Sequence, residues 1–140
     1  MKFAMILAAG EGRRMRPLTN NMPKPLIPVG GKTLLERHIE GLVSAGFTDL
    51  VINASYLSDQ VVAFCGDGQQ WGCRVHLSLE ETPLETAGGI RKALPLLKEE
   101  SFAGVNGDFI NDKPLDPQTQ VEFGGAVAQL VMVAHPKHHQ

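Results

Sequence analysis

Cysteine, aromatic side chains and long apolar segments are all scarce in this sequence of 140 residues. Its two cysteines, Cys65 and Cys73, are not spaced as a C-x-x-C pair, so we predict no disulfide framework and a reduced, cytoplasmic setting. No apolar segment is long enough to span a membrane. Only 6% of the residues are aromatic and few lie near the basic ones, which argues against a surface for stacking nucleic-acid bases. Nucleic acids and membranes are therefore not predicted partners.

The net charge of −2 conceals an uneven distribution of charge along the chain. Residues 1–37 carry seven basic and two acidic side chains, a net charge of +5. The rest of the chain carries six basic and thirteen acidic side chains, a net charge of −7. A compact basic cluster in an otherwise acidic chain favours a small polyanionic ligand over an extended nucleic acid.

The apolar pattern predicts alternating strands and helices. Strands are predicted at residues 3–9, 50–54, 73–79, 102–106 and 126–134, and helices from the capping residue Thr33 to Gly46, from about Ser58, and from Thr86 to about Leu97. Strands separated by helices imply one α/β domain, residues 1–140, with a mostly parallel sheet covered on both faces. Ligands of such sheets bind beyond the carboxyl ends of the strands, where residues 10–16, 80–86 and 107–112 fall.

The same pattern predicts which side chains of two elements are apolar and face inward. In the strand at 73–79 the alternating set is Val75, Leu77 and Leu79. In the helix that starts at Thr86 the inward set is Ile90, Ala93, Leu94 and Leu97, and Pro95 is expected to bend the end of the helix.

A glycine-rich loop follows the first predicted strand in "LAAGEGRRMRPLTNNMPKPLIPV", residues 7–29. It is not a dinucleotide-binding fingerprint, because Met15 stands where the third glycine is needed, and no Lys-Ser/Thr pair completes a Walker A motif. What remains is a loop whose glycines let backbone N–H groups approach a phosphate chain. Arg14 offers a planar fork for phosphate oxygens and Lys24 a point charge. Taken alone, Arg13 or Arg16 is better explained as a solvated loop charge.

The chain resembles the sugar-1-phosphate nucleotidyltransferases in three motifs. These are the glycine-rich segment above, "EETPLETAGGIRKALPLL" at residues 80–97 and "VNGDF" at residues 105–109. Within that family the pattern is most similar to the N-acetylmuramate-1-phosphate uridylyltransferases of cell-wall recycling, with the mannose-1-phosphate guanylyltransferases next. The resemblance implies a Rossmann-like, GT-A-like three-layer α/β/α fold. Members of the family continue well past residue 140, so we expect either a C-terminally truncated, N-terminal part of a longer enzyme or a naturally short relative.

The resemblance also implies a role for each matching residue. The residues that would lie against the nucleobase are Leu7, Ala9 and Gly10, and those at the positions of base-contacting residues in relatives are Glu80, Glu85 and Thr86. The triphosphate would be wrapped by Gly12, Arg13 and Arg14, with Arg14 as the catalytic arginine. Lys24 would hold the α-phosphate, and Asp108 would ligate Mg²⁺. The two glutamates depart from the Gln and Gly that relatives carry there. Asp108 has an alternative reading as a turn residue that ends a strand.

The implied reaction transfers a nucleotidyl group, UMP from UTP in the first instance, to a sugar 1-phosphate. Positioning and electrostatic stabilisation do most of the work in such a transfer, so no protein nucleophile is required. One alternative is a nucleotide-binding module without turnover, and another is an enzyme that resembles the guanylyltransferases. The apolar segment at 126–134 further predicts self-association as a homodimer, or else a strand buried within the sheet.

Overall fold

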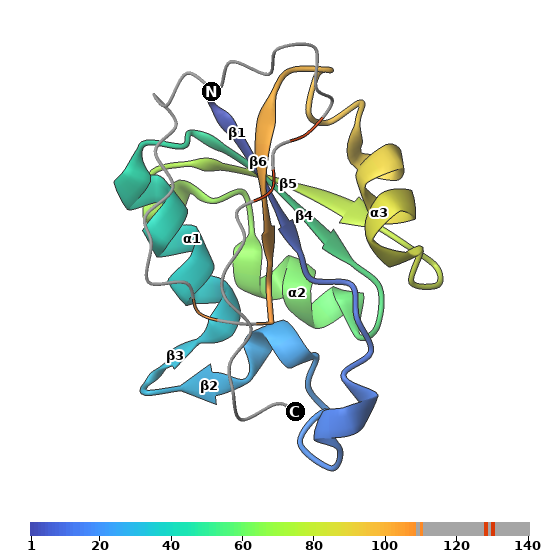
Figure 1. The fold of residues 1–140 in the computed structure, drawn as a ribbon. Coiled ribbons are helices and arrows are strands. Elements are labelled where there is room, and N and C mark those ends of the chain that lie inside the picture. The colour runs from blue at the N-terminus through green and yellow to red at the C-terminus, as the bar shows by residue number, and fades with distance from the viewer. Residues whose placement is uncertain (109, 111–127, 129, 131–140) are drawn as a thin grey trace, which may run out of the picture.

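In the computed structural model, which describes residues 1–108, 110, 128 and 130, four parallel strands form the central sheet. They are β1 (Phe3–Leu7), β4 (Asp49–Ala54), β5 (Arg74–Leu79) and β6 (Phe102–Asn106), in the order β5-β4-β1-β6. Within the same residues the α-helices are α1 (Leu34–Ala45), α2 (Ser58–Cys65) and α3 (Glu85–Ala93) (Figure 1). A short hairpin precedes α1, and single turns of 3-10 helix occur at Arg13–Met15, Lys24–Leu26 and Gln69–Trp71.

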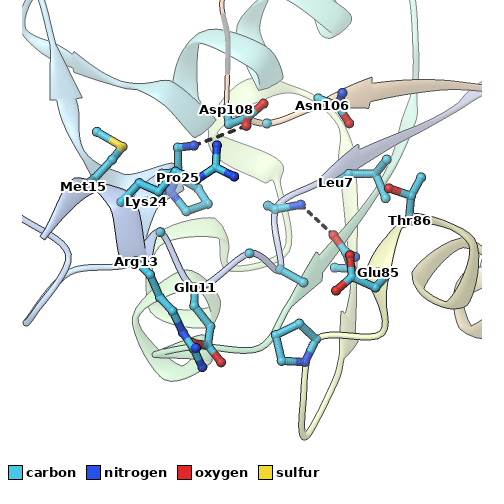
Figure 2. Close-up of a pocket in the computed structure, with 18 residues that line it drawn as sticks. Leu7, Glu11, Arg13, Met15, Lys24, Pro25, Glu85, Thr86, Asn106 and Asp108 are labelled. Carbon is cyan, nitrogen blue, oxygen red and sulfur yellow. Dashed lines mark hydrogen bonds and ion pairs between the residues drawn. The ribbon is translucent and has the colours of Figure 1, made fainter.

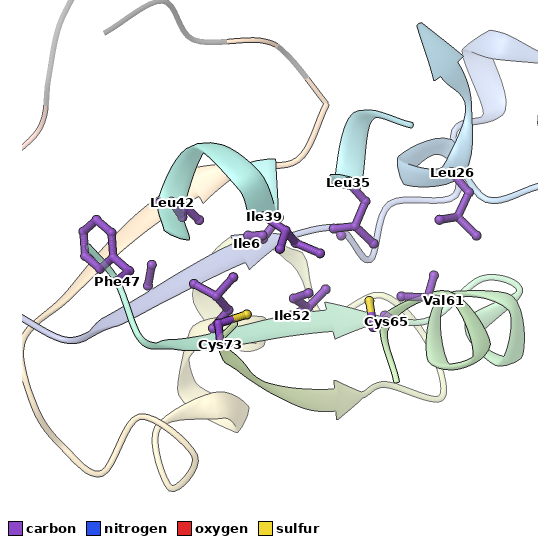
Figure 3. Close-up of a cluster of buried hydrophobic side chains, with 14 residues drawn as sticks. Ile6, Leu26, Leu35, Ile39, Leu42, Phe47, Ile52, Val61, Cys65 and Cys73 are labelled. Carbon is purple, nitrogen blue, oxygen red and sulfur yellow. The ribbon is translucent and has the colours of Figure 1, made fainter. Parts of the chain in front are cut away.

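Alternate residues of β1 face two separate hydrophobic cores. Ala4 and Ile6 pack with residues of α1 and α2 on one face of the sheet (Figure 3). Phe3 and Met5 pack with α3 and Leu97 on the other face. These four residues are at most 2% exposed, which explains why β1 reads as an unbroken apolar run rather than an alternating one. The predicted α/β architecture with a parallel sheet is confirmed.

The ends of α1 follow the predicted capping signals. The Thr33 hydroxyl accepts a hydrogen bond from the Glu36 N–H at 3.0 Å, and Gly46 ends the helix with a left-handed φ of 107°. Both cysteines are free, and burial raises the pKa of the Cys65 thiol to about 12. No helix in the described part of the chain is long and apolar enough to cross a membrane.

Several local predictions were wrong. The first strand ends at Leu7, two residues early, and α3 ends at Ala93, because Pro95 supplies no N–H for another turn. Leu94 is consequently 39% exposed instead of facing inward. At the end of the edge strand β5, Leu79 is 47% exposed while Ser78 is buried. The hairpin of β2 (Pro28–Val29) and β3 (Lys32–Thr33) was not predicted, and the predicted strand at 126–134 lies outside the described residues.

An ion pair between the buried Asp49 and the largely exposed Arg74 joins the starts of β4 and β5, at the edge of the sheet opposite the carboxyl ends of the strands. Arg74 donates from Nε and Nη2 to the two Asp49 carboxylate oxygens at 2.7 and 2.8 Å, and Thr48 Oγ1 donates to the same carboxylate at 2.9 Å. His76 Nε2 lies 3.2 Å from Asp49 Oδ1. The Arg74 guanidinium holds the pKa of Asp49 well below its ordinary value, although burial opposes the shift.

Asp49→Asn should therefore lower the free energy of unfolding by about 2 kcal/mol at neutral pH, because charge-assisted hydrogen bonds are lost. The Asp49 pKa is lower in the folded state, so the stabilisation is present above about pH 4 and is lost as the pH falls towards the folded-state pKa. Urea unfolding at pH 7 and pH 3 measures the difference. Asp67→Asn is the control, since Asp67 is exposed and accepts one hydrogen bond that asparagine keeps. If the difference in unfolding free energy between wild type and Asp49→Asn were the same at pH 7 and pH 3, this role of Asp49 would be contradicted.

Candidate functional site

A pocket of about 840 Å³ lies at the carboxyl ends of β1, β4 and β6. It is lined by residues 7–15, Lys24, Pro25, Asn53, Pro83, Glu85, Thr86 and residues 106–108. The volume suits a ligand of nucleotide size. Of the residues predicted for the site, Leu7, Ala9, Gly10, Gly12, Arg13, Arg14, Lys24, Glu85, Thr86 and Asp108 all line it, and Glu80 does not.

The loop after β1 is held in place around Gly12. Gly12 has a left-handed backbone, with φ 63° and ψ 31°, and it precedes the single turn of 3-10 helix at Arg13–Met15. The fully buried Thr19 donates from its hydroxyl to the Gly12 carbonyl oxygen at 2.8 Å. A Cβ atom on Gly12 would lie 2.8 Å from Thr19 Cγ2, so only glycine fits here. Gly10, by contrast, has open space where a Cβ atom would project.

The two adjacent arginines of this loop differ in their surroundings. Arg13 donates from Nε to the Glu11 carboxylate, and this hydrogen bond holds the pKa of Glu11 below its ordinary value. The Arg13 side chain is 73% exposed. Arg14 also lines the pocket and makes no ion pair with any residue in the described part of the chain. Arg14 is therefore the arginine with an unneutralised charge at the pocket.

Lys24 and Asp108 meet at one side of the pocket although they are 84 positions apart in the sequence. Lys24 lies in the 3-10 turn Lys24–Leu26, and Asp108 follows the end of β6. Lys24 Nζ donates to Asp108 Oδ2 at 3.2 Å (Figure 2). The Lys24 side chain is 27% exposed and that of Asp108 is 53% exposed, so both groups remain accessible to a ligand.

Glu85 and Thr86 form the wall of the pocket on the side away from Lys24 and Asp108 (Figure 2). Glu85 begins α3 with a φ of 60°, a left-handed conformation that costs a non-glycine residue of order 1 kcal/mol or more. The pocket thus has a cationic side, with Arg14 and Lys24, and a side built from the loop between β5 and α3. The cationic side suits the polyanionic end of a ligand.

The family model described as nucleotidyl transferase matches residues 3–139. The chain belongs to the nucleotidyl transferase family. It is 52% identical to the N-acetylmuramate alpha-1-phosphate uridylyltransferase of Neisseria meningitidis, an alignment that covers 97% of this chain and 61% of that protein. The family recognised from the three sequence motifs is thereby confirmed.

Solved structures of the family share the fold. A Bacillus anthracis protein assigned as a glucose-1-phosphate thymidylyltransferase matches with a TM-score of 0.76 and 25% identity, over 82% of this chain and 48% of that one. HddC of Yersinia pseudotuberculosis, in complex with GMP-PN, matches with a TM-score of 0.68 and 30% identity, over 77% of this chain and 48% of that one. This nucleotidyl transferase chain thus spans about half of each solved chain and 61% of the curated relative.

Asp108 fits the requirements of the predicted Mg²⁺ in this nucleotidyl transferase. Magnesium in phosphoryl-transfer sites is commonly held by one or two carboxylates, with substrate phosphates and water completing its coordination. Asp108 is an exposed carboxylate that lines the pocket beside the cationic Lys24. Among the described residues no group of three or more His, Cys, Asp or Glu side chains could hold a metal by itself.

Sequence reasoning missed two residues, one in α2 and one just before it, whose side chains support the glycine-rich loop. Tyr56 donates from Oη to the Thr19 and Asn20 carbonyl oxygens at 2.9 and 3.1 Å. Gln60 Nε2 donates to the Asn21 carbonyl oxygen at 2.9 Å. No sequence motif marks Tyr56 or Gln60, because their role depends on contacts with residues 36 to 39 positions away.

Sequence reasoning also missed Asn53, and it did not foresee the position of Glu80. Asn53 is a buried polar residue near the end of β4 and it lines the pocket. A polar side chain at the end of an otherwise apolar strand is the signal that could have identified it. Glu80 is only 4% exposed and lies behind the pocket wall, hydrogen-bonded to Asn53.

Proposed function

We propose that this chain carries the nucleotide site of a sugar-1-phosphate nucleotidyltransferase that uses UTP and N-acetylmuramate 1-phosphate. The observation that carries the proposal is the placement of Arg14, Lys24 and Asp108 around one pocket at the carboxyl edge of the sheet. The high identity to a relative named as a uridylyltransferase supports the choice of UTP.

In the proposed reaction an oxygen of the sugar 1-phosphate attacks the α-phosphorus of UTP. The bond between the α-phosphorus and its bridging oxygen breaks, and pyrophosphate leaves with the electron pair. The backbone N–H groups of residues 10–14 and the Arg14 guanidinium would hold the β- and γ-phosphates, and the Lys24 ammonium would offset charge at the α-phosphate. Asp108 would hold Mg²⁺, which when bound would supply positive charge to offset that of the phosphates.

UTP with Mg²⁺ should bind at least about tenfold more tightly than GTP with Mg²⁺, a difference of about 1.4 kcal/mol. Isothermal titration with each nucleotide, followed by competition between them, measures this preference. Equal affinities, or displacement of UTP by GTP at similar concentration, would favour a guanylyl enzyme; the solved relative bound to GMP-PN makes GTP the informative competitor.

Turnover is tested separately from binding, because the chain spans 61% of the related uridylyltransferase. Pyrophosphate release from UTP on addition of N-acetylmuramate 1-phosphate reports the transfer. We expect these 140 residues to bind UTP but to release pyrophosphate slowly or not at all. Release at an equal rate with mannose 1-phosphate would contradict the proposed acceptor. Robust release that depended on N-acetylmuramate 1-phosphate would contradict the expected low activity of these residues and support that acceptor.

A further inference from the structure

A buried chain of hydrogen bonds runs behind the pocket and links its two walls. The Ala8 N–H donates to Asn53 Oδ1 at 2.6 Å. Asn53 Nδ2 donates to Glu80 Oε2 at 3.0 Å, and the Leu84 N–H donates to Glu80 Oε1 at 3.0 Å. Asn53 and Glu80 are 3% and 4% exposed. The chain therefore connects the end of β1 to the loop that leads into α3.

The direction of every hydrogen bond in this chain is fixed by its two backbone ends. Both ends, at Ala8 and Leu84, are N–H groups and can only donate. Asn53 must therefore turn its oxygen to Ala8 and its NH₂ group to Glu80. Glu80 must then accept twice, once from Asn53 and once from Leu84. A carboxylate meets this requirement and a carboxamide does not, because one of its two ends is a donor.

The packing around the pair leaves little room for another arrangement. A Cβ atom on Gly89 of α3 would lie 2.8 Å from Asn53 Nδ2 and 3.1 Å from Glu80 Oε2. The backbone of α3 thus rests directly on the two side chains. A buried donor left without an acceptor here would cost free energy that water cannot recover.

We propose that Asn53 and Glu80 are positioning residues for the nucleoside end of the ligand, and that the Glu80 carboxylate orients the pocket walls instead of contacting the base. The inference rests on the proposed nucleotide site. Ala8 lies between Leu7 and Ala9, and Leu84 directly precedes Glu85 and Thr86, so the pair joins the two segments predicted to flank the base. The cationic side of the pocket is not part of this network.

The decisive experiment exchanges the carboxylate and the carboxamide. Glu80→Gln alone places an NH₂ group against either Asn53 Nδ2 or the Leu84 N–H. Asn53→Asp alone brings two carboxylates into contact. In the double variant Asn53→Asp/Glu80→Gln, residue 53 accepts from Ala8 and from the new amide of residue 80, whose oxygen accepts from Leu84. Every hydrogen bond is restored with its direction reversed at one step, and the net charge is that of the wild type.

We expect each single variant to bind uridine and UTP about tenfold more weakly while its affinity for pyrophosphate is unchanged. The double variant should bind uridine and UTP with affinities within about twofold of wild type. Its urea unfolding midpoint should likewise return towards the wild-type value. Titrations are made at a temperature where circular dichroism shows all variants folded. Glu81→Gln, which alters an exposed neighbouring carboxylate, is the matched control and should match wild type throughout.

Wild-type uridine affinity in Glu80→Gln, or a double variant no better than the weaker single variant, would overturn the inference. Equal losses for uridine and pyrophosphate would also overturn it, because they would indicate general damage to the pocket. Failure of the wild-type protein to bind UTP would instead overturn the proposed function. The urea measurements need no ligand, so absence of recovery in the double variant counts against the network in either case.

Discussion

Alanine in place of Arg14 should weaken the binding of UTP with Mg²⁺ by about ten- to a hundredfold and leave the affinity for uridine unchanged. Arg14 lines the cationic side of the pocket, and none of the described acidic side chains neutralises it. A charge-assisted hydrogen bond is worth about 1.5–3 kcal/mol, and each 1.4 kcal/mol corresponds to a tenfold change in affinity. Isothermal titration with UTP, pyrophosphate and uridine separates the contribution of the phosphates from that of the nucleoside.

Arg13→Ala is the comparison that the chain itself provides. Arg13 is the adjacent arginine, but its guanidinium is exposed and already bonded to Glu11. We expect its loss to weaken UTP binding no more than about threefold, since an exposed ion pair contributes little. Equal losses in the two variants would show that the loop contributes a general positive charge rather than a specific contact from Arg14. Equal losses for UTP and uridine in Arg14→Ala would remove Arg14 from the phosphate site.

The sequence was sufficient for the architecture because the architecture depends on local patterns. The capping box at Thr33 and the left-handed Gly46 reflect contacts within one helix, and the unbroken apolar run of β1 reflects burial on both faces of the sheet. The location of the pocket also followed, since the carboxyl ends of parallel strands meet at one edge of a sheet. Leu79 and Leu94 were misplaced because exposure at the end of an element depends on what covers it, which a periodic pattern does not contain.

The pairings within the site could not be predicted in the same way. The ion pair of Lys24 with Asp108 depends on the alignment of β6 beside β1. The hydrogen bond of Glu80 with Asn53 depends on the register of β4 with β5. A resemblance placed Glu80 at the base because it matched a position, whereas the direction of its side chain is set by Asn53, 27 residues earlier. The motifs therefore predicted the segments that line the pocket, and the fold determined which residues of those segments face it.

Gly12→Ala should lower the free energy of unfolding by about 3 kcal/mol, the largest loss expected from one added methyl group in this loop. A left-handed backbone costs alanine about 1 kcal/mol. A further 1–3 kcal/mol is typical of overpacking, and the added Cβ would lie 2.8 Å from Thr19 Cγ2 and 3.2 Å from Lys24 Cβ. Urea unfolding followed by circular dichroism measures the loss. Retention of wild-type stability would show that the loop can shift freely.

Three further variants separate the cost of the left-handed backbone from the cost of the steric clash. Gly72 has nearly the same backbone, with φ 73° and ψ 26°, and open space around its missing Cβ, so Gly72→Ala should lose only the backbone part, about 1 kcal/mol. Thr19→Ser removes Cγ2 but keeps the hydroxyl that donates to Gly12, so the double variant Gly12→Ala/Thr19→Ser should be more stable than the sum of the two single losses predicts. If Gly12→Ala and Gly72→Ala lowered the free energy of unfolding by the same amount, Thr19 would not be the residue that confines the loop.

Because Lys24 lies against the same Cβ position, Gly12→Ala should also weaken UTP binding. This loss of UTP affinity should exceed any change in Gly72→Ala, even where both proteins are fully folded.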